Sequence, residues 1–360
     1  MNIAIVTQPI KSNYGGVLQN YALQHVLRQL GHNPITLDYR DSSPLWFYIG
    51  QTIKTILLAP FPSKRRKITP YRNVFIRSPL IMDFVHKNIT LTKEEMLSYK
   101  RSALTRYDIE AIVVGSDQVW RPMYNPGCLY DTFLGFAHGL NIKKLAYAAS
   151  FGVDNWEFTL EQTKRCGELV RDFDAVSVRE ASGKELCKSY LSVDAVEVLD
   201  PTLLLNADDY KAVCSQVPTA KNDYLCAYIL DGDEEKLSVV KTFAKSLCCE
   251  LKLFSAHTQL ELSVEEWLAM FRDAKFVITD SFHGSVFSII FHKPFYSLVN
   301  SDRGASRFHS LLGKFGLSSR IITSLPEKEN PNINWSDVEA KRIQWKTISI
   351  DYINQHLTVK

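Results

Sequence analysis

The chain alternates short apolar runs with stretches of helical periodicity, and this alternation constrains its fold more than any other feature. In the first half the runs, some with the turn that follows, fall at residues 3–6, 34–39, 112–114, 145–152, 174–180 and 196–204. In the second half they fall at residues 225–230, 251–254, 274–278 and 295–299. Short β-branched runs separated by helices are typical of parallel strands buried on both faces. We therefore expect an α/β fold of two doubly wound, Rossmann-like domains that face each other across a cleft.

The length of the chain, 360 residues, is sufficient for two domains with separate cores. Asp200 and Pro201 follow the last run of the first half, and such a pair is typical of a chain leaving a domain. We expect a first domain at residues 1–205, a second at residues 206–330, and a helical tail at residues 331–360 that is able to pack back on the first domain.

A polar turn at residues 279–285 is the first candidate for a functional site. It follows the apolar run at residues 274–278 and precedes a helical apolar pattern, so it lies where ligands bind in parallel sheets. His283 lies in this turn beside Gly284. An imidazole there could exchange a proton near neutral pH, next to helix amides that could hold an anion. The alternative is that His283 only caps the helix or packs against it.

A second candidate loop follows the first strand. Gly15 and Gly16 lie where that strand passes into the first helix, so a ligand could approach the backbone closely. The pattern does not match G-x-G-x-x-G, which argues against a dinucleotide site. Asn13, Gln19 and Asn20 beside the glycines favour a loop that faces a sugar or an anion. Close packing of the helix on the strand is the alternative.

A third candidate loop follows the run at residues 112–114. It contains Ser116, Asp117 and Gln118, and Trp120 comes shortly after. A carboxylate and an amide can hold sugar hydroxyls while an indole covers the apolar face of the ring, so the loop fits a saccharide site. The alternative is that Asp117 caps a helix and Trp120 belongs to the core.

Arginines follow two of the predicted strands. Arg179 closes the run at residues 174–180, and Arg303 and Arg307 are four residues apart at the entry to a helix. All three are candidates to bind an anion. The alternatives are a surface ion pair of Arg179 with Glu180 or Glu185, and a solvated basic turn for the other two.

Composition and charge exclude several other classes of protein. The formal net charge of +3 is too small to indicate nucleic-acid binding. The seven cysteines show neither CxxC nor metal-ligand spacing, so we expect reduced core cysteines in a cytoplasmic protein and no metal site. The N-terminal residues form a strand rather than a signal peptide, and no apolar run reaches the roughly 20 residues that a membrane span needs.

The stretch at residues 44–62 is rich in aromatic and aliphatic residues, and a basic cluster at residues 64–67 follows it. A buried helix with a solvated basic loop is one interpretation. The other is an interfacial helix whose basic end meets anionic lipid, which would place the protein peripherally at the inner face of the membrane.

The motifs described above resemble those of the polysaccharide pyruvyl transferase family. Three blocks carry the resemblance: residues 13–23, residues 114–120, and residues 281–284 together with 293–295. The likeness continues through residues 178–180, 199–202 and 303–308, so it extends in order through most of the chain.

This resemblance implies a GT-B-like fold and the transfer of pyruvate from phosphoenolpyruvate onto two hydroxyls of a sugar. The product is a ketal in a bacterial cell-surface or capsular polysaccharide, and the acceptor could be lipid-linked. His283 is then the general acid that protonates the methylene carbon. The implied donor-binding residues, mostly in the second domain, are Arg179, Ser281, Gly284, Arg303 and Arg307. The implied acceptor-binding residues, in the first domain, are Asn13, Gly15, Gly16, Gln19, Ser116, Asp117, Gln118 and Trp120. Phosphoenolpyruvate is a co-substrate, and no cofactor or metal is expected.

The chain departs from the family in the block around His283. Members often carry Arg-Leu-His where this chain has Ser281, Phe282 and His283, so one anion contact is missing. Either Arg303 or Arg307 replaces it in space, or the donor is held differently. Two other functions stay open: a glycosyltransferase that uses a nucleotide sugar, and a sugar-binding module without catalysis.

Overall fold

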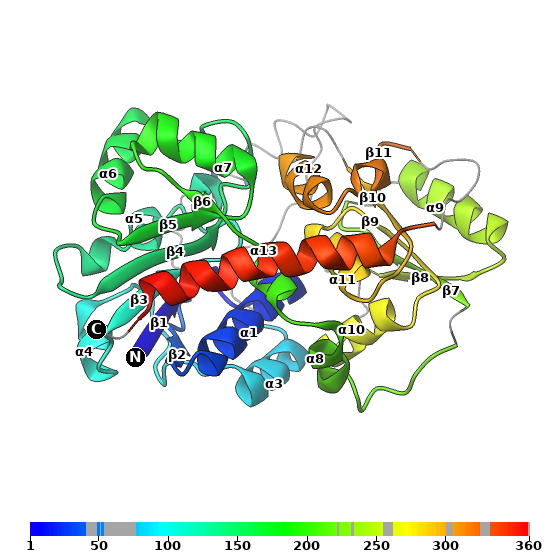
Figure 1. Cartoon of the computed structure of the whole chain (residues 1–360), viewed down its shortest axis with the longest axis horizontal. Coiled ribbons are helices and arrows are strands. Elements are labelled where there is room, and N and C mark those ends of the chain that lie inside the picture. Colours follow the sequence, from blue (N-terminus) through cyan, green and yellow to red (C-terminus); the bar gives the residue numbers. More distant parts are fainter. Residues whose placement is uncertain are drawn as a thin grey trace.

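A computed structural model describes residues 1–40, 49–50, 52–53, 77–221, 223–231, 234–254, 262–299, 305–324 and 332–358. Two lobes lie side by side, and the C-terminal helix runs along both of them (Figure 1). None of the helices in these ranges combines the length and the apolar character needed to cross a membrane. The segments at residues 44–62 and 64–67 lie almost wholly outside the described residues, so contact with a membrane surface stays a prediction.

The first lobe contains a six-stranded sheet in which neighbouring strands are parallel. Its strands are β1 (Asn2–Val6), β2 (Asn33–Thr36), β3 (Ala111–Val114), β4 (Lys143–Ala149), β5 (Ala175–Val178) and β6 (Val196–Glu197). Their order is β2-β1-β3-β4-β5-β6. The chain winds outward from β1 in one direction and from β3 in the other, so a topological switch point lies between β1 and β3.

The second lobe repeats this winding with a different sequence. Its strands are β7 (Tyr224–Tyr228), β8 (Glu250–Phe254), β9 (Phe276–Thr279), β10 (Phe295–Leu298) and β11 (Ile321–Ile322). Their order is β11-β10-β9-β7-β8, again with parallel pairs, which is the order of the first five strands of the other sheet. A second switch point therefore lies between β7 and β9. The predicted fold class, two doubly wound parallel α/β domains, is confirmed.

Helices connect the strands and cover the sheets. Their bounds are α1 (Tyr14–Gln29), α3 (Pro79–Asn88), α4 (Arg101–Arg106), α5 (Leu129–Thr132), α6 (Leu160–Val170), α7 (Ala181–Leu186), α8 (Ala207–Val213), α9 (Glu234–Ser246), α10 (Val264–Arg272), α11 (Phe282–Ile290), α12 (Ala305–Lys314) and α13 (Trp335–His356). The sequence marks the start of α10 with a capping box, in which Ser263 accepts from the Glu266 amide and the Glu266 carboxylate accepts in return.

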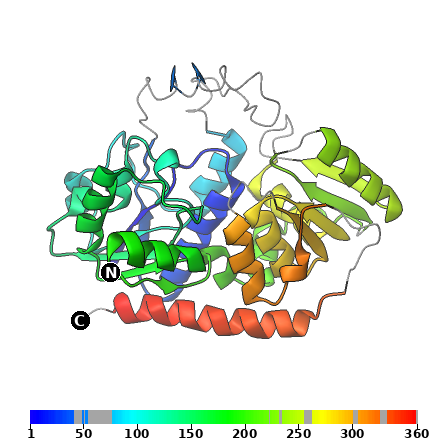
Figure 2. The same cartoon turned by 90° about the horizontal axis from the view of Figure 1, so that it is seen from above.

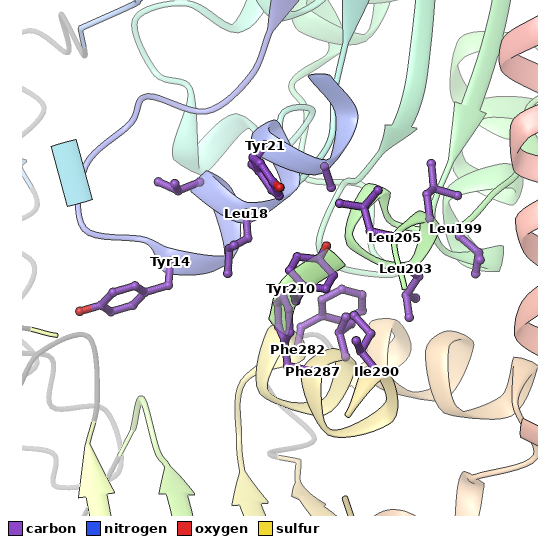
Figure 3. Packing of buried hydrophobic residues seen from close by; sticks show 14 of the residues in the cluster. Tyr14, Leu18, Tyr21, Leu199, Leu203, Leu205, Tyr210, Phe282, Phe287 and Ile290 are labelled. Carbon is purple, nitrogen blue, oxygen red and sulfur yellow. The ribbon is translucent and has the colours of Figure 1, made fainter. Parts of the chain in front are cut away.

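The apolar core continues from one lobe into the other. Figure 3 shows Leu18 of α1, Leu203 of the segment after β6, and Phe287 of α11 in the same packed cluster. Tyr14, in the first turn of α1, stacks on Trp267 of α10 with ring centroids 5.6 Å apart. Burial of side chains of this size stabilises a fold by about 1.5–3 kcal/mol each. The N-terminus of α1 is therefore held against the second lobe.

Helix α13 is one continuous helix that lies along both lobes (Figure 2). On the first lobe, the Ser349 hydroxyl accepts from the Leu199 amide at 2.9 Å, and the Tyr352 hydroxyl donates to the Ala146 carbonyl at 3.0 Å. On the second lobe, Trp335 stacks on His292 with centroids 5.0 Å apart. The predicted domain limits at residues 205 and 330 stay predictions, because the cores merge at the lobe interface.

Candidate active site

Loops from both switch points meet between the lobes, and Asp200 lies at the centre of their contacts. It follows β6, begins the short 3₁₀ helix η6 (Pro201–Leu204), and is 2% exposed. Its Oδ2 accepts hydrogen bonds from Gln19 Nε2 at 2.7 Å and from Arg179 Nη1 at 2.8 Å. Its Oδ1 accepts from the Thr202 amide and hydroxyl at 3.1 and 2.6 Å. One carboxylate thus joins α1, the end of β5 and the segment after β6.

His283 lies in the first turn of α11 and reaches across the interface into this group. Its Nε2 is 2.8 Å from Gln19 Nε2 and 3.9 Å from Asp200 Oδ2. Its Nδ1 faces Gly15, where an added Cβ would stand only 2.0 Å from that nitrogen. The ring is 7% exposed, but its immediate surroundings are polar rather than apolar. The structure therefore places the imidazole among ionisable groups, as an acid–base role requires.

The surroundings of His283 lower its pKa below the usual value. Burial is the largest cause because it disfavours the charged ring, and the positive charges of Arg179 and Arg307 act in the same direction. The carboxylates of Asp200 and Asp117 oppose this shift without cancelling it. The ring is accordingly neutral near neutral pH before any anion binds.

Arg179 lies in a buried ion cluster rather than in a surface pair. It is 5% exposed, and its nitrogens lie 2.8 Å from Asp200, 3.3 Å from Asp117 and 3.5 Å from Glu180. The Phe282 ring covers the guanidinium, with Cζ 4.4 Å from its centroid. The alternative interpretation, in which Arg179 forms an ion pair at the protein surface, is therefore wrong. Three carboxylates share the charge of Arg179 in this structure.

The pKa of Asp200 is lowered by this arrangement. Burial alone would raise it, but the fields of His283 and Arg179 and the Thr202 hydrogen bond outweigh that cost. Asp200 is therefore a fixed negative charge across the working pH range. It compensates the guanidinium and would also stabilise an imidazolium at His283.

Buried polar groups that the described residues leave without partners lie on α7 and α12, two helices that contact each other where the Ala181 amide donates to Ser310 Oγ at 3.2 Å. Arg307 Nε and Ser306 Oγ of α12, with Ser182 Oγ of α7, are buried and have no hydrogen-bond partner among the described residues. Burial and the nearby charge of Arg179 lower the pKa of Arg307. Buried donors of this kind are costly unless a ligand satisfies them. This seam could accept an oxyanion. Arg303, the other predicted arginine of this segment, lies outside the described residues.

Ser281 and Gly284 shape the turn before His283. The Ser281 hydroxyl accepts from the Gly284 amide at 3.4 Å and so caps α11. An added Cβ at Gly284 would stand 2.2 Å from Thr279 Oγ1, so glycine is required for the turn to close on β9. The Ser281 hydroxyl therefore already accepts a hydrogen bond from one of the α11 amides that were expected to bind the donor.

The polar residues of the first-lobe loops lie close to this group. Asn13 Nδ2 donates to Asp117 Oδ2 at 3.2 Å, and Asp117 has a left-handed backbone with φ of 63° rather than a helix-capping conformation. The Ser116 hydroxyl donates to the Ala148 carbonyl at 3.0 Å and lies 3.4 Å from Asp200 Oδ2. The structure therefore brings Asn13, Ser116 and Asp117 together with His283.

Of the other predicted acceptor residues, Gln118 and Gly16 lie at the edge of this group, whereas Gln19 lies inside it. Gln118 Oε1 accepts from Arg121 Nη1 at 3.2 Å. Gly16 packs against Asn13, whose Nδ2 would stand 3.2 Å from an added Cβ. Gln19 is 1% exposed and directs its amide nitrogen at Asp200 and His283 rather than outward. Gln19 therefore belongs to the polar interior of the site.

Trp120 belongs to the core, so the prediction that its indole covers a sugar is wrong for this structure. It is 0% exposed, stacks on Phe133 with centroids 4.8 Å apart, and donates from Nε1 to the Thr132 carbonyl at 3.0 Å. Both faces and the polar edge of the ring are therefore occupied by protein.

Two residues that organise the site were not predicted as site residues. Asp200 was assigned no role in the site, although it follows an apolar strand in the same way as Asp117. Lys314 of α12 donates to Glu197 of β6 and to the Arg179 carbonyl, the latter at 3.3 Å, and so links the lobes. A cavity of about 10 Å³, room for about one water, is lined by Arg179, Asp200 and Lys314, among others.

Replacing Gly15 with alanine tests the contact with the His283 ring. The added Cβ would overlap Nδ1, so the ring must move, and we expect turnover to fall about 10²-fold, as misplaced catalytic groups typically cause. Gly313→Ala on α12 is the matched control, because its Cβ would meet only Ser318 Oγ at 3.9 Å. Wild-type turnover of Gly15→Ala, measured by release of inorganic phosphate, would show that the ring position is unimportant.

Comparison with known proteins adds three findings. A family model described as polysaccharide pyruvyl transferase matches residues 13–302. No curated protein sequence matches the chain. Among solved structures, the UDP-N-acetylglucosamine 2-epimerase of Rickettsia bellii is similar at 10% identity and a TM-score of 0.47, with 99% of each chain covered. A glycosyltransferase of Rickettsia africae ESF-5 is similar at 9% identity and a TM-score of 0.48, covering 100% of this chain and 99% of its own. The UDP-GlcNAc 2-epimerase of Neisseria meningitidis is similar at 10% identity and a TM-score of 0.49, covering 100% of this chain and 95% of its own.

Proposed function

The chain belongs to the polysaccharide pyruvyl transferase family, and we propose that it transfers pyruvate from phosphoenolpyruvate onto two hydroxyls of a sugar to form a ketal. The observation that carries this proposal is the position of His283. Its ring lies between the lobes, 3.9 Å from the Asp200 carboxylate and within the fields of Arg179 and Arg307. An acid, a fixed anion and cations in one place suit a reaction that protonates carbon and releases phosphate.

The donor site in this proposal is the seam between α7 and α12. Its buried donors, Ser182 Oγ, Ser306 Oγ and Arg307 Nε, would meet the phosphate or carboxylate oxygens, with Arg303 as a further candidate. The anion would then supply the hydrogen bonds that the described residues do not. Acceptor hydroxyls would meet the first-lobe loops at Asn13, Ser116 and Asp117.

In the reaction, His283 gives a proton to the methylene carbon of phosphoenolpyruvate, which becomes a methyl group. The adjacent carbon becomes oxocarbenium-like and is attacked by the first sugar hydroxyl. Phosphate then leaves with the electron pair of its carbon–oxygen bond, and the second hydroxyl closes the ketal ring. Of the two hydroxyl protons, one replaces the proton given by His283 and the other leaves with phosphate. Negative charge at Asp200 stabilises the imidazolium before transfer, and cations at the seam stabilise the departing phosphate.

Two further proposals concern the setting of the reaction. We place the enzyme in the cytoplasm, because its cysteines are free and five of them are buried. Its family supports a place in the synthesis of bacterial cell-surface or capsular polysaccharide. The acceptor is a saccharide and could be carried on a lipid at the inner membrane face.

The test is release of inorganic phosphate from phosphoenolpyruvate in the presence of lipid-linked galactose, mannose or N-acetylhexosamine acceptors. We expect release only with a suitable acceptor, in equal amount to the ketal detected by mass spectrometry. Binding of saccharide without phosphate release, or transfer from a nucleotide sugar under the same conditions, would refute the proposal.

A further inference from the structure

The Gln19 side chain lies between Asp200 and His283 in a geometry that fixes the form of the histidine ring. Gln19 Nε2 is 2.7 Å from Asp200 Oδ2 and 2.8 Å from His283 Nε2. A carboxylate only accepts hydrogen bonds, so the atom facing Asp200 must be the amide nitrogen. That nitrogen has a second hydrogen, and it points to His283 Nε2. The ring must therefore accept at Nε2 and carry its proton on Nδ1.

The other end of the same amide is unused. Gln19 Oε1 is buried and has no hydrogen-bond partner among the described residues. A proton arriving at His283 Nε2 would face the N–H group of Gln19, which is unfavourable for both. A half-turn of the amide would present Oε1 to the new N–H, but it would also place Oε1 against Asp200 Oδ2, which only accepts hydrogen bonds. Asp200 therefore keeps the amide nitrogen toward His283 Nε2, and this orientation favours the neutral ring.

We propose that the Gln19 amide is a positioning device for His283: with its nitrogen fixed by Asp200, it holds the neutral ring as the Nδ1–H tautomer and opposes protonation of Nε2. The inference rests on the proposed function, because it concerns the protonation of the residue that acts as the acid in that reaction. It replaces the expectation that Gln19 contacts the acceptor. Gln19 favours the neutral ring and so delays its protonation until an anionic donor is present.

Other charged groups face the same ring and act alongside Gln19. Asp200 and Asp117 favour its protonated form, whereas Arg179 and Arg307 disfavour it. Phe282 and Gly15 contact the ring without charge. Removing Gln19 removes the hydrogen bond to the neutral form and also leaves Asp200 Oδ2 with one donor fewer, so both effects favour the imidazolium.

The direct experiment is nuclear magnetic resonance of the full chain labelled with ¹⁵N-histidine, with His283→Ala used to assign the ring signals. The wild type should show the Nδ1–H tautomer at neutral pH. Gln19→Leu should move the titration of His283 upward by about one pH unit, and Gln19→Glu, which offers a carboxylate to Nε2, should move it further. If Gln19→Leu fails to fold, the nearly isosteric Gln19→Glu carries the test alone.

The matched control is Gln29→Leu on the same helix. Gln29 is exposed and contacts His25 at 3.1 Å, so a glutamine–histidine pair is lost without touching His283. An Nε2–H tautomer in the wild type, or an unchanged His283 titration in both Gln19 variants, would overturn the inference. These spectra need no turnover, so they stay informative if the proposed reaction is absent. Where turnover is present, the pH at which activity falls on the alkaline side should rise in the Gln19 variants together with the titration of His283.

Discussion

His283→Ala should lose transfer activity by about 10²–10⁴-fold, the usual contribution of a general acid, while its stability stays near that of the wild type. The reason is that no other described side chain combines a titratable proton with this position between Gly15, Gln19 and Asp200. Steady-state release of inorganic phosphate from phosphoenolpyruvate measures the loss. Thermal unfolding measures the stability of the variant relative to the wild type.

The control for this prediction is His86→Ala. His86 is exposed on α3 and should leave both phosphate release and unfolding unchanged. A His283→Ala enzyme that keeps near wild-type turnover would eliminate the acid role and with it the mechanism. A variant that is unfolded would be uninformative about chemistry, so His283→Gln, which keeps much of the side-chain volume, serves as the second variant.

Arg179→Met should destabilise the protein by about 3–5 kcal/mol, the usual effect of removing one partner of a buried ion cluster. The variant leaves Asp200, Asp117 and Glu180 without the guanidinium that now lies among them. Arg165→Met is the matched control, because Arg165 pairs with Glu168 on the exposed face of α6 and should cost at most about 0.5 kcal/mol. Urea unfolding at neutral pH measures both.

The stability difference between the wild type and Arg179→Met should decrease as the pH falls from neutral into the acid range. In the wild type the pKa of Asp200 is lowered, so this carboxylate contributes stability above its unfolded pKa, and the contribution is lost as the pH falls through the folded value. In the variant the pKa of Asp200 rises, so protonation relieves the buried charge. The difference should be largest at neutral pH and shrink below about pH 4. A difference that is constant with pH would indicate lost packing against Phe282 instead.

The sequence predicted central strands such as β1, β3 and β9 well because they are buried along nearly their whole length and are largely apolar. The run at residues 274–278 corresponds to β9, and the helical pattern after Gly284 corresponds to α11. The tail at residues 331–360 was expected to be helical and contains the single helix α13. The two-residue strand β11 was missed because its two isoleucines are flanked by polar residues, whereas the equally short β6 lies within a longer apolar run.

The site was predicted in part, and the errors have a common cause. His283, Asn13 and Asp117 were found because each follows a strand, and strand ends meet at one edge of a sheet. Whether a side chain then faces solvent or protein depends on residues far away in the chain. Gln19 meets a histidine 264 positions later, and no local pattern carries that information. Trp120 likewise lies in a core whose other rings come from later segments.

A single long helix attached to both lobes restricts how the lobes can move relative to each other. Helix α13 has 22 residues, about 33 Å of rigid rod, and is bonded to the first lobe at Ser349 and stacked on the second at Trp335. The lobes cannot pull straight apart without breaking these contacts. Because α13 crosses from one lobe to the other, a hinge opening between the lobes must likewise bend this helix or release one of these contacts.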